Sequence, residues 1–252
     1  MNRLDTLNSL DLTPNRTRQV GAESGVLSTV RGSAPHTLFT PLHYEANYAY
    51  PLLVWLHGPG GDERQLKRIM PHVSLRNYVG IAPRGTSRVT ASRGEQGGYD
   101  WPQTHQDYVQ AEGRVFDAIQ AASLQLNISP TRIFLAGFDT GGTLALRLAM
   151  AHPTQFAGVL SLGGRFPTAR APLSRLNHAR QVPLFLATGC DSTEYPPEDV
   201  CADLRLFHAA GMSVALRQYQ PCGHEISTVM LADMDRWMME QINGVPATAE
   251  QT

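Results

Sequence analysis

The stretch from residue 132 to residue 150 constrains the fold more than any other part of the chain. The apolar run at residues 132–136 (Arg-Ile-Phe-Leu-Ala) is typical of a buried strand, and residues 143–150 are rich in Leu and Ala, which favour helix. Between them lies the turn Gly-Phe-Asp-Thr-Gly at residues 137–141. Its two glycines lack a Cβ, so strand and helix can approach closely. The pattern predicts a strand, a tight turn and a helix in direct succession.

The rest of the chain repeats this alternation. Further strands are predicted at residues 26–30, 38–43, 52–56, 78–82, 156–162, 182–188 and 214–219. Helices are predicted at residues 63–70, 107–126 and 231–242. Strands that alternate with helices, without an internal repeat or a long linker, predict one α/β domain with a doubly wound, mostly parallel sheet. We expect this domain to span residues 23–244, with residues 1–22 as a tail or strap and residues 245–252 as a C-terminal tail.

Composition restricts the partners of such a domain. The chain has 252 residues, is 42% hydrophobic and carries a net charge of −1, which favours a globular domain and argues against nucleic acid or an anionic membrane as a partner. No apolar stretch approaches the roughly 18–20 residues of a membrane span, and the N-terminus lacks the apolar core of a signal peptide. We therefore expect a cytoplasmic protein that binds a small molecule; a homo-oligomer is left open.

Four polar residues directly follow predicted strands: His57, Asp139, Asp191 and His224. In an open parallel sheet, ligands bind beyond the carboxyl ends of the strands, where these residues should meet. The three residues after the elbow strand and the last two strands come in the order nucleophile position, acid and histidine, which is the order of one of the three known hydrolase arrangements. This order favours a catalytic triad over isolated structural residues.

The chain resembles the phospholipase/carboxylesterase (dienelactone-hydrolase-like) branch of the α/β-hydrolases between about residues 26 and 243. Four motifs carry the resemblance: Leu-His-Gly-Pro-Gly-Gly-Asp-Glu at 56–63, Gly-Tyr-Asp-Trp at 98–101, the turn with its flanks at 135–142, and Gly-His-Glu-Ile-Ser at 223–227. The resemblance implies an α/β-hydrolase fold without a large cap domain. No organic cofactor is expected, because the only glycine-rich turns are the hydrolase ones. One imidazole and two carboxylates would suit a divalent metal ion, but nothing supplies further ligands in a recognisable spacing, so no metal is expected.

The resemblance also implies roles for individual residues. The nucleophile position falls on Asp139, the base on His224, and the acid on Asp191. Asp191 lies two residues after Gly189, where the family more often has three, so Glu194 stays open as the acid. The remaining assignments are the substrate pocket (Tyr99, Trp101 and His57) and the oxyanion hole (Thr140, Pro59 and Gly60).

Two of these positions depart from the family pattern. Asp139 stands where the family has a serine, and losing that nucleophile costs a serine hydrolase roughly a millionfold in turnover. Pro59 stands where a backbone N–H should stabilise the oxyanion, and proline has none. Such a loss typically costs about 2.7–4 kcal/mol unless Gly60 or Gly61 replaces the donor. Ordinary serine esterase chemistry is therefore not expected.

Three interpretations remain. The first is a hydrolase of small ester-like substrates with an atypical triad, favoured because His224 and an acid are both present. The second is a non-catalytic binding protein that retains the pocket. The third is a hydrolase with an aspartate nucleophile, of the dehalogenase or epoxide-hydrolase type. Against the third, the stretch at residues 163–181 is too short for the helical cap that those enzymes carry.

Overall fold

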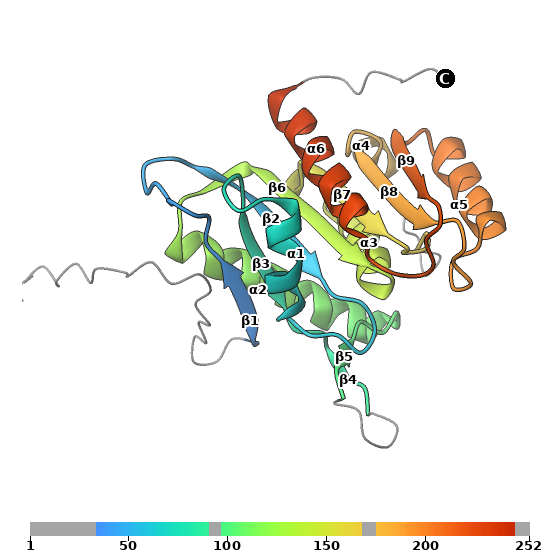
Figure 1. The fold of residues 1–252 in the computed structure, drawn as a ribbon, viewed down its shortest axis with the longest axis horizontal. Helices are drawn as coiled ribbons and strands as arrows, with labels where there is room; N and C mark the ends of the chain where they lie inside the picture. The colour runs from blue at the N-terminus through green and yellow to red at the C-terminus, as the bar shows by residue number, and fades with distance from the viewer. Residues whose placement is uncertain (1–33, 91–96, 168–174, 245–252) are drawn as a thin grey trace, which may run out of the picture.

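A computed structural model describes residues 34–90, 97–167 and 175–244. Its centre is a seven-stranded sheet in the order β1-β3-β2-β6-β7-β8-β9 (Figure 1). All neighbouring strands are parallel except β1, which pairs antiparallel with β3. The strands of this sheet are β1 (His36–Phe39), β2 (Tyr50–Leu56), β3 (Val79–Pro83), β6 (Ile128–Phe138), β7 (Gly158–Leu162), β8 (Leu184–Gly189) and β9 (Val214–Tyr219). The doubly wound, mostly parallel sheet predicted from the sequence is confirmed.

Helices cover both faces of the sheet (Figure 1). They are α1 (Gln65–Val73), α2 (His105–Gln125), α3 (Thr140–Ala151), α4 (Leu176–Ala179), α5 (Pro197–Ala209) and α6 (Thr228–Asn243), with a short 3-10 helix at Pro153–Gln155. Strands β4 (Ser87–Arg88) and β5 (Tyr99–Asp100) form a small separate hairpin. Helices α1 and α6 contribute to one hydrophobic cluster, and α2, α3 and α5 to the other.

Strand β2 shows why the sheet is covered on both faces. All seven of its residues are buried. Leu52, Val54 and Leu56 belong to the cluster under α2 and α3, whereas Leu53 and Trp55 belong to the cluster under α1 and α6. Successive side chains of a strand point to opposite faces, so a continuous apolar run requires a helical layer on each side.

The predicted elements differ from the observed ones mainly at their ends. The strand at 214–219 agrees with β9 residue for residue, whereas α1 begins at Gln65 and continues past Pro71 to Val73. Helices α4 and α5 and the hairpin of β4 and β5 were not predicted. The strand expected at 26–30 and both tails, 1–22 and 245–252, lie outside the described residues.

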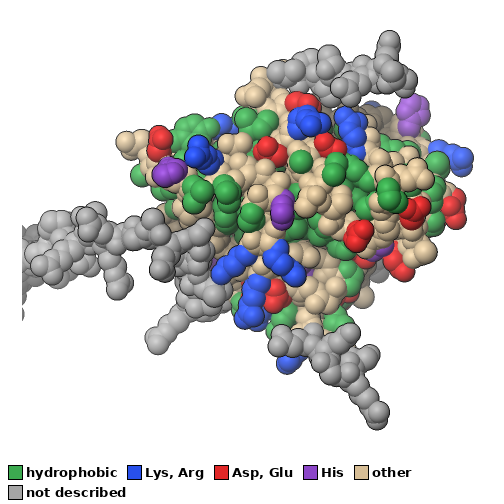
Figure 2. All heavy atoms as spheres, viewed as in Figure 1, with side chains coloured by type: hydrophobic (Ala, Val, Ile, Leu, Met, Phe, Trp, Pro, Cys, Tyr) green, Lys and Arg blue, Asp and Glu red, His purple; other side chains and the backbone are tan. Residues whose placement is uncertain are grey.

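The surface of the α1 and α6 side carries charges of both signs. Figure 2 shows Lys and Arg side chains interspersed with Asp and Glu over this face of the described residues, as a net charge of −1 leads one to expect. Within the same residues, none of the helices is both long and apolar enough to cross a membrane.

Candidate functional site

Asp139 occupies a strained turn between β6 and α3. Its φ of 51° and ψ of −119° lie where residues other than glycine are rarely found. The backbone is held there from two sides, because the Asp139 N–H donates to the Leu162 carbonyl at 2.9 Å and the Thr143 N–H donates to the Asp139 carbonyl at 2.9 Å. The strand, tight turn and helix predicted from residues 132–150 are confirmed.

The glycines around this turn leave no room for a side chain. A Cβ on Gly137 would lie 2.4 Å from the carbonyl carbon of Gly141, and a Cβ on Gly141 would lie 2.2 Å from the Leu56 oxygen. Strand β6, helix α3 and the end of β2 therefore meet backbone against backbone. This close packing fixes Asp139 at the carboxyl edge of the sheet.

His224 reaches Asp139 from the loop that follows β9. Its Nε2 lies 2.8 Å from Asp139 Oδ2, and a carboxylate can only accept, so Nε2–H is the donor. The imidazole lies 5.0 Å from the Phe138 ring, measured between centroids. Gly163, with φ of 61°, lies beside it, and a Cβ there would come within 2.9 Å of His224 Cε1. The structure thus brings together two of the residues assigned to the triad.

The acid expected from the sequence is not at the other imidazole nitrogen. Ser192 Oγ lies 3.1 Å from His224 Nδ1. The Asp191 carboxylate instead accepts the Cys222 N–H at 3.1 Å, and both Asp191 and Glu194 are exposed. The assignment of the acid to Asp191, or to Glu194, is therefore withdrawn, because the side chain that bonds Nδ1 is that of Ser192.

The physical reason is the path of the turn after β8. The Asp191 N–H donates to the Cys222 carbonyl at 2.9 Å and the Ser192 N–H to the Gly189 carbonyl at 3.3 Å. This path brings residue 192, and not 191, to the imidazole. Ser192 lies three residues after Gly189, the spacing that is usual in the family, so spacing alone could have found the position.

His57 and Trp101, assigned to the substrate pocket, are core residues. Both are completely buried. His57 Nδ1–H donates to the Gly58 carbonyl at 2.8 Å, while Nε2 accepts the Gly85 N–H at 2.9 Å. Burial lowers the pKa of His57, so the ring is neutral. The Trp101 indole donates to the His57 carbonyl at 3.0 Å. With their polar atoms used by the backbone, these side chains hold loops together and cannot contact a substrate.

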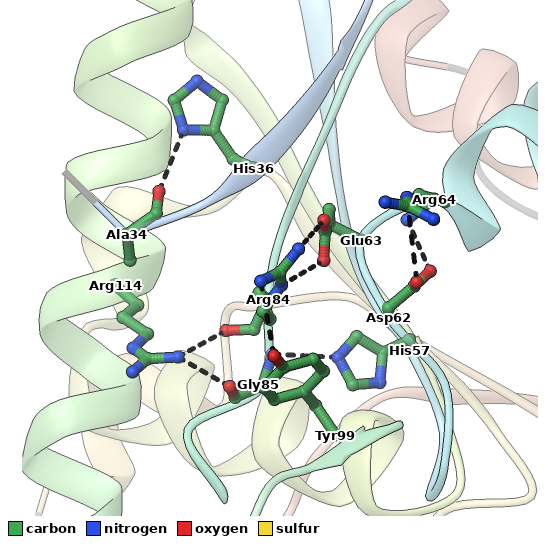
Figure 3. Close-up of polar contacts among 10 residues, drawn as sticks. All are labelled: Ala34, His36, His57, Asp62, Glu63, Arg64, Arg84, Gly85, Tyr99 and Arg114. Atoms are coloured by element: carbon green, nitrogen blue, oxygen red, sulfur yellow. Dashed lines mark hydrogen bonds and ion pairs between the residues drawn. The ribbon is translucent and has the colours of Figure 1, made fainter. Parts of the chain in front are cut away.

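Tyr99, the third pocket candidate, packs in an ionic cluster. Figure 3 shows the Arg84 guanidinium facing the Glu63 carboxylate, with Tyr99 beside it. Arg84 donates to both oxygens of Glu63, at 2.7 and 2.5 Å, and lies 4.7 Å from the centre of the Tyr99 ring. Burial acts to raise the pKa of Glu63, but the hydrogen bonds from Arg84, a backbone hydrogen bond and the charges of Arg84 and Arg64 together outweigh it and leave that pKa below its ordinary value. Tyr99 is half-buried on this ion pair.

The loop after β2 turns sharply at Pro59 and Gly60. The Gly61 N–H donates to the Gly58 carbonyl at 3.1 Å, and Gly60 has φ of 69°. Pro followed by a positive-φ Gly is the signature of a type II turn. This bond uses the Gly61 N–H, whereas the Gly60 N–H has no partner among the described residues.

Thr140 is the first residue of α3, so its N–H has no acceptor within the helix. Its side chain is engaged elsewhere, because Oγ1 donates to Asp100 Oδ1 at 2.7 Å. No group of three or more His, Cys, Asp or Glu residues suited to a metal ion occurs in the part of the chain that the structure describes.

Known proteins share this sequence pattern and this architecture. A model of the phospholipase/carboxylesterase family matches residues 45–242. The chain is 31% identical over 125 residues to a putative esterase, NocK, of Nocardia uniformis subsp. tsuyamanensis, a match covering 48% of this chain and 35% of that protein. It is 24% identical over 116 residues to a probable carboxylesterase of Arabidopsis thaliana, covering 46% of this chain and 44% of the other. The chain thus spans less than half the length of both relatives.

Among solved structures, a carboxylesterase from Mesorhizobium loti superimposes with a TM-score of 0.66. The match is 21% identical and covers 86% of this chain and 99% of that one. At such identity the likeness shows the fold alone.

Proposed function

Because the chain belongs to the phospholipase/carboxylesterase family and has the α/β-hydrolase fold, we propose that it hydrolyses small ester-like substrates with Asp139 in the usual place of the serine. The observation that carries the proposal is the 2.8 Å hydrogen bond from His224 Nε2 to Asp139 Oδ2 at the strained turn. The Asp139 side chain makes no capping bond to α3. Its carboxylate is therefore directed to the histidine and is not consumed as a helix cap.

Water is the nucleophile in this proposal. Attack by the Asp139 carboxylate on a carboxyl ester would give an anhydride, a high-energy intermediate. As a general base, Asp139 instead takes one proton from water while the water oxygen bonds to the acyl carbon. The C–O bond to the alcohol then breaks, and the leaving oxygen takes the proton back from Asp139. His224 donates to the carboxylate throughout and keeps it oriented.

The negative charge on the acyl oxygen needs donors. The Thr140 N–H, at the first turn of α3, is one, and the helix dipole adds to its effect. The Gly60 N–H is the second, because Pro59 has no hydrogen and the Gly61 N–H is bonded to Gly58. Both donors are backbone groups at the carboxyl edge of the sheet.

One observation favours a second candidate, a binding protein without catalysis. Pro59 removes one oxyanion donor at the position where the family supplies it, and Asp139 removes the serine. A chain with both changes could retain a ligand pocket alone. The two candidates differ in whether the purified protein turns over an ester.

The test is hydrolysis of short-chain p-nitrophenyl esters by the wild type, Asp139→Asn and His224→Ala. We expect turnover by the wild type and a loss of at least about 100-fold in Asp139→Asn, because the amide cannot act as a base. Asp139→Ser serves as the matched variant that restores the family's residue. If the wild type shows no turnover while Asp139→Ser is active, the hydrolase proposal fails and the non-catalytic binding protein becomes the better interpretation.

Isotope labelling separates the water route from an aspartate nucleophile. A single turnover in H₂¹⁸O should leave Asp139 unlabelled in a peptide mass spectrum, because the labelled oxygen goes to the acid product. Label in Asp139 would show that its carboxylate attacks the substrate and that water then cleaves the adduct, the dehalogenase-like chemistry.

A further inference from the structure

We infer that Ser192 is the positioning residue for His224, and that the hydroxyl and the carboxylate of the familiar triad have exchanged ends here. The inference rests on the proposed function only where it concerns activity. Its structural part is a chain of hydrogen bonds that runs from the Tyr195 N–H through Ser192 and His224 to Asp139.

For a neutral imidazole, the direction of every bond in this chain follows from the groups involved. Asp139 is a carboxylate, so His224 Nε2 carries the hydrogen of their 2.8 Å bond. A neutral imidazole has one N–H, so its Nδ1 is bare and accepts the Ser192 hydroxyl at 3.1 Å. The Ser192 oxygen in turn accepts the Tyr195 N–H at 3.0 Å. Each donor has one acceptor, and Ser192 is only 4% exposed.

This arrangement is the reverse of the one in a serine hydrolase. There, Nδ1–H donates to a carboxylate and the bare Nε2 accepts from the nucleophile. A carboxylate at residue 192 could only accept, so it would require the ring hydrogen on Nδ1. A hydroxyl at that place can donate to Nδ1, and a neutral ring then carries its hydrogen on Nε2, directed at Asp139. Serine suits this position because, unlike aspartate, it can donate to Nδ1.

The surrounding packing holds the ring in the same orientation. Phe138 lies against one side of the imidazole, and the bare Cα of Gly163 faces Cε1. The nearby carboxylate of Asp191 is satisfied by the Cys222 N–H. Asp191 therefore supplies a matched control: it neighbours Ser192 in sequence, carries the charge that Ser192 lacks, and does not bond the ring in the structure.

The first test needs no activity. In a ¹⁵N-labelled protein at a pH where the ring is neutral, NMR shifts of the imidazole nitrogens, assigned with His224→Gln, should show the hydrogen on Nε2. Ser192→Ala should shift the Nδ1 resonance because it loses its donor, and Asp191→Asn should leave it unchanged. A hydrogen on Nδ1, or a shift in Asp191→Asn but not in Ser192→Ala, would overturn the inference. Since ester turnover plays no part, this result is separate from the fate of the proposed function.

The second test restores the familiar order of groups. In the Asp139→Ser background, a second change of Ser192→Asp should raise kcat for p-nitrophenyl esters at least about tenfold, because a carboxylate selects the Nδ1–H form and frees Nε2 to take the serine proton. KM should change little. The double variant Asp139→Ser, Asp191→Asn should equal Asp139→Ser. If the Asp191 change lowers kcat and the Ser192 change does not raise it, Asp191 is the positioning residue and the inference fails.

Discussion

The loops after β2 and after β8 lie at the same edge of the sheet but are held by different means. The first, residues 57–63, contains a completely buried histidine and ends at Glu63, whose carboxylate is paired with Arg84. The second, residues 190–195, has exposed Asp191 and Glu194. It is tied down by backbone hydrogen bonds and by the hydroxyl of Ser192.

The two loops therefore differ in what their motif residues do. In the first loop, the side chains of the family motif serve the architecture: His57 bonds the backbone and Glu63 pairs with Arg84. In the second loop, backbone hydrogen bonds set the path that brings residue 192 to His224, and the Ser192 hydroxyl adds a bond to the Tyr195 N–H.

The largest expected effect on stability comes from removing the ion pair at the end of the first loop. Glu63→Ala should lower the free energy of unfolding by about 3 kcal/mol, the low end for a buried ion pair, since Arg84 is left unpaired but is itself 24% exposed. Urea denaturation gives the value. The neighbouring Asp62→Asn is the control, because the Asp62–Arg64 pair is 3.9 Å long and largely exposed, and its loss should cost less than about 0.5 kcal/mol. Equal losses would show that burial does not distinguish the two pairs.

A smaller effect concerns the side of the sheet that holds His224. Gly163→Ala should cost about 1 kcal/mol for its positive φ and should also displace the imidazole, since the new Cβ would lie 2.9 Å from Cε1. Gly244→Ala, with φ of 68° and no atom near its Cβ, should carry only the cost of its positive φ and leave ester turnover unchanged. Thermal melts and turnover of both variants check this. A Gly163→Ala protein that keeps full turnover contradicts the placement of His224.

A third effect is a change in the pH dependence of stability, which is absent at neutral pH and above. Burial lowers the pKa of His57 in the folded protein, whereas the unfolded chain has the ordinary value of about 6.5. Stability from this group is therefore complete above about pH 6.5 and is lost as the pH falls below it, by at most about 1.4 kcal/mol per pH unit.

Replacing His57 should remove its contribution to the change of folding stability with pH. The stability gap between the wild type and His57→Gln, measured by denaturation from pH 8 to pH 5, should narrow as the pH falls. Asp62, Glu63 and Asp100 are the carboxylates whose charges act on the ring in the opposite sense. A gap that widens at low pH would mean that they outweigh burial.

Most of the fold could be predicted because its signals are local. The apolar run of β2 indicated its position, and the start of α2 has a capping threonine, Thr104, whose hydroxyl accepts the Asp107 N–H. Helix α5 was missed although it also carries a signal: Pro197 in its first turn, followed by Glu198 and Asp199. Its only buried residues are Val200 and Phe207, so its periodicity is weak.

The site was only partly predictable because its contacts are long-range. Asp139 and His224 are 85 residues apart and were found from motif order. Ser192 carries no charge and belongs to no motif, so only spacing could indicate it. His57 and Trp101 lie in the motifs of the family, but burial depends on how the loops fold over them, which local sequence does not encode.

The bare glycine contacts described around the elbow recur farther along the same edge of the sheet. A Cβ on Gly98 would come within 1.8 Å of the Gly60 oxygen, and one on Gly189 within 2.2 Å of the Cys222 oxygen. For directed evolution, these glycines are therefore positions at which a side chain would clash with backbone atoms. A library that varies residues 139 and 192 leaves these glycine contacts intact, whereas one that randomises the glycines forces side chains into space that backbone atoms already fill.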